Sequence, residues 1–297
     1  MIHELSPQRF DNTFSARVPS ASDRVMLFGN GTMLVKPLEG QHCFDFPVFE
    51  EFSQVFPSGY AFFHAFAIDD VRYYLAFPET TPVVPGDTNG GKGADDNNAP
   101  SLGGMQYQPI EEFRKTSCKA AGHAAQTGWH LHRWYTRNRW CGMCGNPMKH
   151  AATERALQCP TCGNRVYPTI APAVIVAVVD GDRLLMTRYS HRAYRARALV
   201  AGFCEIGETA EETVSREVFE ETGLCVKNIR YYKSQPWGYA GDLLLGYVCE
   251  LDGSPKIMLD EKELATAEWV PRDEIFEEND DVSLTREMIT RFKEGLL

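Results

Sequence analysis

The C-terminal part of the chain alternates between two periods of apolar residues. Two runs near its start, AVIVAVV and RLLMTRY, have the length and β-branched content of buried strands. Residues 210–222 have helical spacing, strand-like runs follow at 229–233 and 243–250, and an amphipathic helix is expected near 284–292. Such mixing predicts an α/β (α+β) domain, an α/β/α sandwich, over residues 169–297.

The N-terminal part has a different pattern. Short apolar runs broken by Gly, Pro and Asp predict a small β-rich domain over residues 1–109; the runs are residues 25–28, 33–35, 61–68 and 71–77. Near 78–104 there are too few apolar side chains to offset the entropy of ordering, so we expect a flexible insertion there. Residues 110–137 have Ala-rich helical spacing and predict a linking helix.

Length and charge limit the classes of protein. With 297 residues, 43% of them hydrophobic, the chain can form two domains with cores. Its longest apolar run is shorter than the roughly 20 residues of a membrane helix, and its first ten residues lack the apolar core of a signal peptide. We therefore expect a cytoplasmic protein with no membrane partner.

The net charge of −10 argues against a protein that mainly binds nucleic acid through phosphates. Basic residues nevertheless gather in two stretches, which form either a solvated face or a contact for a local anionic partner. These residues are Arg133, Arg137, Arg139, Lys149, Arg155 and Arg165, followed by Arg188, Arg192, Arg195 and Arg197.

Four of the nine cysteines form two C-x-x-C pairs, Cys141 with Cys144 and Cys159 with Cys162. Two such pairs complete the tetrahedron of thiolates that Zn²⁺ prefers. Unmetallated cysteines or a redox pair fit less well, because the motif occurs twice. The spacing predicts one structural zinc per chain in a zinc ribbon over residues 138–168.

Three glutamates share one face of the helix predicted over residues 210–222. Glu217, Glu220 and Glu221 stand at positions i, i+3 and i+4. At 4 Å each like-charged pair costs about 4 kcal/mol at an effective dielectric constant near 20, so a cluster in a cleft calls for cations. Hard oxygen ligands favour Mg²⁺ or Mn²⁺. The alternative is a solvated, Glu-rich face.

The order of residues around these glutamates matches a known pattern. Gly202, five residues, Glu208, seven residues, then Arg216-Glu217-Val218-x-Glu220-Glu221-x-Gly223-Leu224 agrees with the Nudix box at every fixed position. The chain resembles one Nudix subfamily, the zinc-ribbon NADH pyrophosphatases. Its ribbon leads into Val166-Tyr167-Pro168, Leu199-Val200-Ala201-Gly202-Phe203 enters the box, and Ser234-Gln235-Pro236-Trp237 follows it.

The resemblance implies roles for individual residues. It implies that Mg²⁺ or Mn²⁺ is bound by Glu217, Glu221, Glu263 and the carbonyl of Ala201. Glu220 is implied to be a further ligand or to orient water, and Arg216 to hold the helix carboxylates. The implied substrate contacts are Glu154, Tyr167, Phe203, Gln235, Trp237, Asp242 and Thr285.

Two stretches depart from the subfamily's pattern. After Trp237 the family commonly continues Pro-Phe-Pro-x-Ser, whereas this chain has Gly238-Tyr239-Ala240-Gly241-Asp242. The loss of two prolines predicts a more mobile loop. Near the C-terminus, Thr285 stands where the family usually has alanine.

The implied activity is hydrolysis of the pyrophosphate bond of NADH or NAD to NMN(H) and AMP by a homodimer. The general base is open between Glu220, Glu263 and a metal-bound hydroxide. Three alternatives involve other activities. They are removal of NAD caps from RNA, hydrolysis of ADP-ribose-type diphosphates, and nucleic-acid binding by a ribbon protein with a decayed Nudix fold, which the intact glutamate set disfavours.

Overall fold

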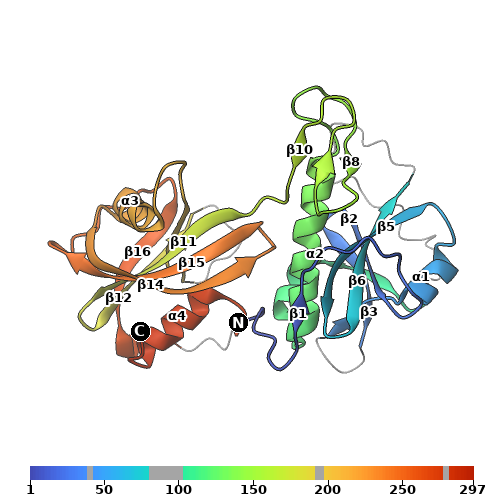
Figure 1. Cartoon of the computed structure of the whole chain (residues 1–297). Helices are drawn as coiled ribbons and strands as arrows, with labels where there is room; N and C mark the ends of the chain where they lie inside the picture. Colours follow the sequence, from blue (N-terminus) through green and yellow to red (C-terminus); the bar gives the residue numbers. More distant parts are fainter. Residues whose placement is uncertain (39–42, 80–102, 191–196, 277–280) are drawn as a thin grey trace. The chain divides into compact units, whose positions relative to one another are not determined.

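The computed structural model describes residues 1–38, 43–79, 103–190, 197–276 and 281–297 (Figure 1). The chain divides into two compact units. The C-terminal unit comprises Met1, Ile170–Trp237 and Gly241–Leu297, and the N-terminal unit comprises Ile2–Thr169 and Gly238–Ala240. In the described ranges, none of the helices combines the length and the apolar character that a membrane crossing requires.

The C-terminal unit is built on one six-stranded sheet of order β14-β15-β11-β12-β16, with β13 paired to β11. β11 and β15 are parallel, and the other pairs are antiparallel. The strands are β11 (Ala171–Asp180), β12 (Arg183–Tyr189), β13 (Val200–Phe203), β14 (Cys225–Trp237), β15 (Asp242–Asp252) and β16 (Leu264–Pro271). The helices are α3 (Ala210–Thr222), α4 (Leu284–Lys293) and the short 3-10 helix Arg272–Glu274.

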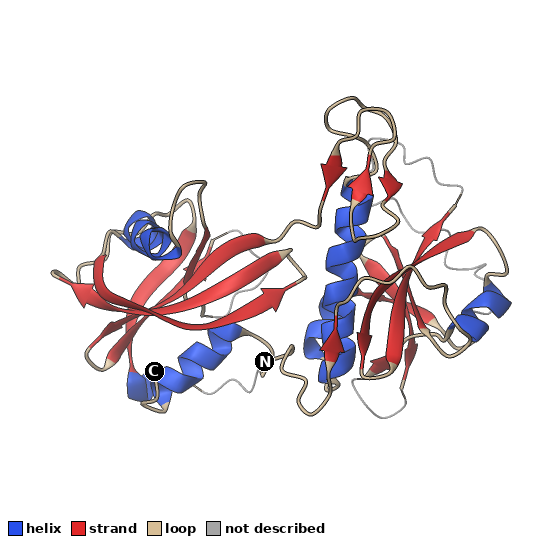
Figure 2. Cartoon of the chain, in the orientation of Figure 1, coloured by secondary structure: helices blue, strands red, loops and turns tan. Residues whose placement is uncertain are grey.

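Helices α3 and α4 cover opposite faces of this sheet (Figure 2). The apolar run of β11 is buried on both faces, because successive strand residues point to opposite sides. Val176 packs with Val214 and Val218 of α3, whereas Ile175 packs with Met288 of α4. The predicted α/β/α sandwich is confirmed.

The N-terminal unit contains a seven-stranded sheet of order β1-β5-β6-β2-β3-β4, with β7 paired to β3, and a three-stranded ribbon of order β10-β9-β8. The sheet strands are β1 (Phe10–Asp11), β2 (Arg24–Gly29), β3 (Thr32–Pro37), β4 (Phe44–Asp45), β5 (Tyr60–Ile68), β6 (Val71–Pro78) and β7 (Gln106–Pro109). The helices are α1 (Phe49–Val55), the 3-10 helix Ile110–Lys115 and α2 (Lys119–Arg137). The ribbon strands are β8 (Lys149–His150), β9 (Leu157–Gln158) and β10 (Arg165–Val166).

The core of the N-terminal unit lies between its large sheet and α2. Met26 and Phe66 of the sheet share one cluster of buried side chains with Ala124, Ala125 and Leu131 of α2. This explains the Ala-rich apolar spacing of the helix, since small side chains allow a sheet to approach closely.

The single helix predicted over residues 110–137 is wrong in its first part. Ile110–Lys115 is a 3-10 helix, and α2 begins only at Lys119. The hydroxyl of Thr116 accepts a hydrogen bond from the backbone N–H of Cys118 at 3.3 Å. Such local side-chain bonds compete with helix continuation, which accounts for the break.

The flexible insertion predicted near 78–104 lies mostly outside the described residues, which exclude 80–102. The predicted strands at 229–233 and 243–250 are found within the longer strands β14 and β15. β16 was not predicted, because its sequence LATAEWVP mixes polar and apolar residues without a continuous run.

Candidate functional site

Helix α3 carries the three glutamates and has the predicted ends. The Thr209 hydroxyl accepts a hydrogen bond from the Glu212 backbone, and the Glu212 side chain bonds back to the Thr209 backbone. This capping box supplies partners for N–H groups that the first helical turn leaves unbonded. Gly223 ends the helix at a φ of 68°, in the left-handed region that favours glycine.

Arg216 is the centre of the charged network on this helix. It donates two hydrogen bonds to Glu208, at 2.6 and 2.9 Å, and one each to Glu217 at 2.8 Å and Glu220 at 3.0 Å. A further bond of 3.0 Å goes to the backbone carbonyl of Phe203 in β13. One planar guanidinium therefore fixes the carboxylate face of α3 against the end of a strand.

The pKa values within the network respond to this guanidinium. Arg216 lowers the pKa of Glu208 to about 2, although partial desolvation acts the other way. In return, hydrogen bonds first from Glu208 and then from Glu217 and Glu220 raise the pKa of Arg216. Glu208 thus stays charged at every pH at which the protein is expected to function.

Glu217 is the most confined of the carboxylates that Arg216 contacts, with a side chain 13% exposed. It lies against β13: a Cβ built on Gly202 would stand 1.9 Å from Glu217 Cδ and 2.1 and 2.2 Å from its two oxygens. Removal from water raises the pKa of Glu217, Arg216 partly offsets this, and Glu220 and Glu263 raise the pKa further. Such a group gains from a cation that compensates its charge.

The other glutamates surround this position at different depths. Glu220 has a side chain 58% exposed, while Glu221 is 2% exposed. Glu263 is an exposed residue in the turn before β16, and its charge acts on Glu217. Within the described part of the chain, only the four ribbon cysteines bring three or more candidate ligand atoms within 4.8 Å of one another. The glutamates are spread more widely, as their mutual repulsion favours.

Three of the predicted substrate contacts lie on one face of the C-terminal sheet. Phe203 pairs with Ala173 of β11, and Asp242 pairs with both Ala171 and Trp237. Ala171 and Ala173 point to the same face because they are two residues apart on one strand. Ile175 and Ala177, the next two residues of β11 that point to this face, lie in the same buried cluster as side chains of α4. The two aromatic residues thus share the α4 face and the end of the sheet at which β11 starts.

These three predicted contacts differ in their exposure to solvent. The Phe203 side chain is 55% exposed, whereas Asp242 is 8% exposed and Trp237 is half-buried. Thr285, another predicted contact in this unit, is half-buried in the first turn of α4, directly after the Ser283–Leu284 start of the helix.

Gln235, which the resemblance implied to be a substrate contact, has other partners in the structure. Its side chain is fully buried, its amide nitrogen donates to the carbonyl of Val282 at 2.7 Å, and its amide oxygen accepts from the N–H of Leu284 at 2.7 Å. Both ends of the amide are therefore used to hold the start of α4. Its contact with substrate stays a prediction.

Glu154 and Tyr167 belong to the N-terminal unit, where the structure brings them together. The Tyr167 hydroxyl donates to Glu154 Oε1 at 3.4 Å, and Arg165 forms an ion pair with the same oxygen at 2.5 Å. Tyr167 is 52% exposed. Their contact with substrate stays a prediction.

The turn Gly238–Ala240, at which the sequence departs from the family pattern, is well supported in the N-terminal unit. Gln126 Oε1 accepts from the N–H of Gly238 at 3.3 Å, and Arg133 donates to the carbonyls of Tyr239 and Ala240 at 2.9 and 3.1 Å. A Cβ on Gly238 would lie 2.2 Å from the Gln126 carbonyl oxygen. These contacts hold the turn in one conformation, and the greater mobility that we expected from the loss of prolines stays a prediction.

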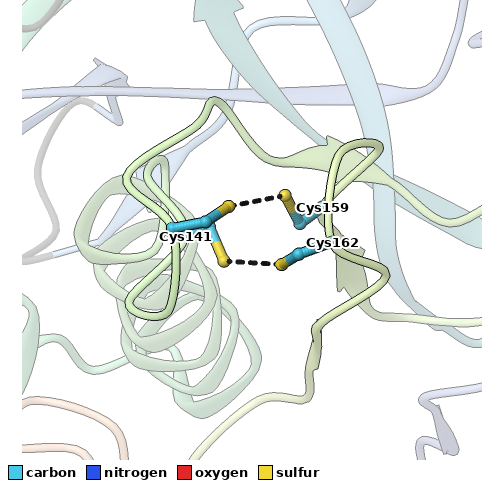
Figure 3. Close-up of side chains that lie close together, drawn as sticks. Cys141, Cys159 and Cys162 are labelled. Carbon is cyan, nitrogen blue, oxygen red and sulfur yellow. Dashed lines mark hydrogen bonds between the residues drawn. The ribbon is translucent and has the colours of Figure 1, made fainter.

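The cysteines of the ribbon form a compact ligand set (Figure 3). Cys141 and Cys162 have their sulfurs 3.5 Å apart, as do Cys144 and Cys159, and all four sulfurs lie within 4.8 Å. A tetrahedron with Zn–S bonds of about 2.3 Å has sulfur–sulfur edges of about 3.8 Å, so the set fits zinc.

The two halves of this ligand set have matching backbones. Gly145 N–H donates to the carbonyl of Cys141 at 2.8 Å, and Gly163 N–H donates to that of Cys159 at 3.0 Å. Both glycines have positive φ, 71° and 77°. Each C-x-x-C pair is therefore a tight turn closed by a glycine, which brings its two sulfurs to one side.

Two residues were missed as site residues although the box pattern contained them. Glu208 was matched but given no role, and the structure makes it the main partner of Arg216. Gly202 was read as a fixed position, and the structure shows that its missing side chain makes room for Glu217. Their fixed places in the pattern were the available signal.

Comparisons with known proteins agree with this geometry. Residues 169–292 match the model of the NUDIX domain, and residues 136–167 match that of the NADH pyrophosphatase zinc ribbon domain. Two curated relatives carry the name NAD-capped RNA hydrolase NudC: one from Salmonella typhi, 42% identical over 151 residues, and one from Citrobacter koseri, 41% identical over 151 residues. Each match covers 51% of this chain and 58% of the relative, so the chain spans little more than half the length of these proteins.

Among solved structures, a NUDIX hydrolase from Nitrosomonas europaea is similar at 20% identity and a TM-score of 0.46, over 53% of this chain and 91% of that one. The family resemblance drawn from the box, the ribbon and the stretch after the box is confirmed by the two matched domains. Residues 136–167 therefore correspond to an NADH pyrophosphatase zinc ribbon domain, and the NUDIX domain follows it at residues 169–292.

Proposed function

We propose that this chain hydrolyses the pyrophosphate bond of NADH or NAD and releases AMP and NMN(H), with Mg²⁺ or Mn²⁺ as the catalytic cation. The observation that carries this proposal is the environment of the Glu217 carboxylate. It occupies the space that a side chain on Gly202 would take, it accepts a hydrogen bond from Arg216, and its pKa is raised because it is partly removed from water. A purely structural helix has no need of such a costly arrangement.

The residues present suit a hard divalent cation. Glu217, Glu221 and Glu263 offer carboxylate oxygens and Ala201 offers a carbonyl oxygen, which is the donor set that Mg²⁺ and Mn²⁺ prefer. When bound, these cations neutralise charge on the phosphate oxygens and lower the pKa of a bound water. Arg216 keeps the carboxylates aligned and Glu208 keeps Arg216 aligned.

Glu220 is the group of this cluster that is best placed for proton transfer. Its side chain is 58% exposed and is held by Arg216 at 3.0 Å, so it is oriented and accessible to water at the same time. In our proposal it accepts the proton of the water that attacks one phosphorus in line with the leaving phosphate.

Phe203 and Trp237 offer flat faces to a base or nicotinamide ring. They lie on the same face and at the same end of the sheet, and Phe203 is largely exposed. The Phe203 carbonyl also accepts a bond from Arg216, so the recognition strand and the carboxylate helix are linked by one side chain. We propose that stacking here fixes one half of the dinucleotide.

Two further parts of the proposal concern the whole molecule. We propose that the ribbon binds one structural Zn²⁺ per chain, which elemental analysis after dialysis measures. We also propose that the protein is a homodimer, as the subfamily resemblance implies, and light scattering coupled to size-exclusion chromatography measures this.

Removal of NAD caps from RNA is a second candidate, because the curated relatives that match this chain are named for that activity. The chemistry at the pyrophosphate is the same. The ribbon also presents Trp140, 50% exposed, within a stretch containing Arg137 and Arg139, a combination that suits a nucleotide chain.

A substrate panel tests the proposal. The protein, with Mn²⁺ or Mg²⁺ added, is assayed on NADH, NAD, ADP-ribose and NAD-capped RNA, and kcat/KM is compared. We expect NADH or NAD to exceed ADP-ribose by at least about tenfold, since ADP-ribose lacks the nicotinamide ring. Equal rates on ADP-ribose would show a general diphosphatase, and a higher kcat/KM on capped RNA would favour the second candidate.

A further inference from the structure

The turn that carries Glu263 is tied to the end of α3, and one residue makes most of the connections. Residues 258–263, which we call the strap, lie between β15 and β16 in the sequence and contact the C-terminal end of α3. Met258 N–H donates to the carbonyl of Thr222 at 2.8 Å, and Asp260 N–H donates to the carbonyl of Glu221 at 3.1 Å. These carbonyls are among the last four of the helix, which have no partner within it.

Asp260 also fixes the other end of the strap. Its carboxylate accepts from the N–H of Lys262 at 3.0 Å, which forms an Asx turn. Its carbonyl accepts from the N–H groups of Glu263 at 3.2 Å and Leu264 at 3.0 Å. Glu263 is therefore two backbone hydrogen bonds away from Glu221, and Asp260 is the residue between them.

Ser190, at the end of β12, holds the same turn from the opposite side. Its N–H donates to the carbonyl of Glu263 at 3.0 Å, and its hydroxyl lies 3.1 Å from the carbonyls of both Lys262 and Glu263. These bonds hold the backbone of the exposed turn from which the Glu263 side chain projects, and so reduce the number of conformations that the turn can adopt.

We propose that Asp260 is a positioning residue. Its carboxylate closes the turn on Lys262 and thereby holds the strap in the conformation in which its backbone links Glu221 to Glu263, so that both carboxylates are presented to the same divalent cation. The inference rests on the proposed function, in which both glutamates bind that cation. Partners of this kind, which orient ligands without touching the metal, typically change metal affinity by 10- to 100-fold when removed.

The test compares Asp260→Ala with Asp260→Asn in the full chain. Asparagine keeps an oxygen that accepts the Lys262 N–H but carries no charge, so it separates positioning from simple electrostatic attraction of a cation. Asp252→Ala is the matched control, because Asp252 is an exposed acidic residue at the end of β15, paired with Lys227 at 3.2 Å. Binding of Mn²⁺ is measured directly by electron paramagnetic resonance, and melting temperatures are recorded in parallel.

We expect Asp260→Ala to weaken Mn²⁺ binding by about tenfold or more, and Asp260→Asn to stay within about threefold of the wild type. The control should bind as the wild type does. Wild-type affinity in Asp260→Ala, or a loss that asparagine does not rescue, would overturn the coupling. Should Asp260→Ala fail to fold, Ser190→Ala loosens the turn from the other side, and unchanged Mn²⁺ binding in that variant would contradict the proposal. A wild-type chain that binds no Mn²⁺ would instead defeat the proposed function, and the coupling with it.

Discussion

The carboxylate of Glu217 packs against Gly202 and occupies the space that a side chain at this position would take. A Cβ at Gly202 would come within 1.9 Å of Glu217 Cδ, far closer than two carbon atoms can approach. The strand and the helix are therefore fitted to each other at the position where the box pattern requires glycine. The obstructing atoms are the far end of a flexible side chain, so a substitution would move the carboxylate rather than the backbone.

Gly202→Ala should for this reason disable the site without unfolding the protein. We expect the affinity for Mn²⁺ and kcat/KM each to fall by at least about tenfold, with the melting temperature within about 3 °C of the wild type. Gly29→Ala is the control, since a Cβ there meets nothing within 4 Å. Wild-type activity in Gly202→Ala would show that Glu217 does not need its present position.

The raised pKa of Glu217 predicts a pH dependence of stability. A carboxyl group whose pKa is raised on folding stabilises the fold at low pH, and this contribution is lost as the pH rises from the ordinary value of 4.5 through the raised pKa. Glu217→Gln should therefore gain in melting temperature relative to the wild type as the pH rises from about 4.5 to 7.5. The melts use dialysed protein without added Mg²⁺ or Mn²⁺, because a strong chelator would also remove zinc. A constant difference between the two proteins would contradict the assignment.

Loss of one ribbon thiolate should destabilise the N-terminal unit. Cys159→Ser is expected to lower the melting temperature and the zinc content, because structural zinc contributes its binding free energy to folding. Cys225→Ser is the control, since Cys225 is an exposed free cysteine outside the ribbon. Unchanged stability together with absence of zinc in the wild type would show that the four cysteines are not a metal site.

Truncation of Phe203 tests ring stacking. Because its side chain is 55% exposed, Phe203→Ala should keep a near-native melting temperature. Loss of an aromatic stack is expected to lower kcat/KM for NADH by about tenfold, with a smaller effect on ADP-ribose if the ring is nicotinamide. Phe219→Ala is the control, because Phe219 is equally exposed but lies on α3. Equal losses on both substrates with a lower melting temperature would indicate a packing role.

The carboxylate helix could be predicted almost residue by residue. Thr209, Glu212 and Gly223 encode its ends through local hydrogen bonds and a left-handed cap, and these signals do not depend on the rest of the fold. The break before α2 also has a local cause, the Thr116 hydroxyl. A threonine at this position is compatible both with a continuous helix and with a break, so the sequence alone did not predict the break.

Tertiary partners were harder to predict. Gln235 lies in a stretch typical of the subfamily, but nothing in the sequence indicated that its amide would hold the start of α4 through one donated and one accepted hydrogen bond. The partners of the turn after Trp237 could not be predicted either, since Gln126 and Arg133 are more than 100 residues away in the sequence. Local patterns do not report on bonds between distant segments.

The most direct measurement is the release of AMP and NMNH from NADH by the wild type and by Glu220→Gln, both with added Mn²⁺. The reaction products are separated by chromatography, and Glu250→Gln serves as a control because Glu250 is an exposed glutamate bonded to Asn228 at 2.9 Å. We expect equal amounts of the two mononucleotides from the wild type and the control, and a kcat lower by at least about 10² in Glu220→Gln, which keeps the fold. No cleavage of NADH by the metal-loaded wild type would contradict the proposed function, and a Glu220→Gln rate within threefold of the wild type would remove this glutamate from the mechanism.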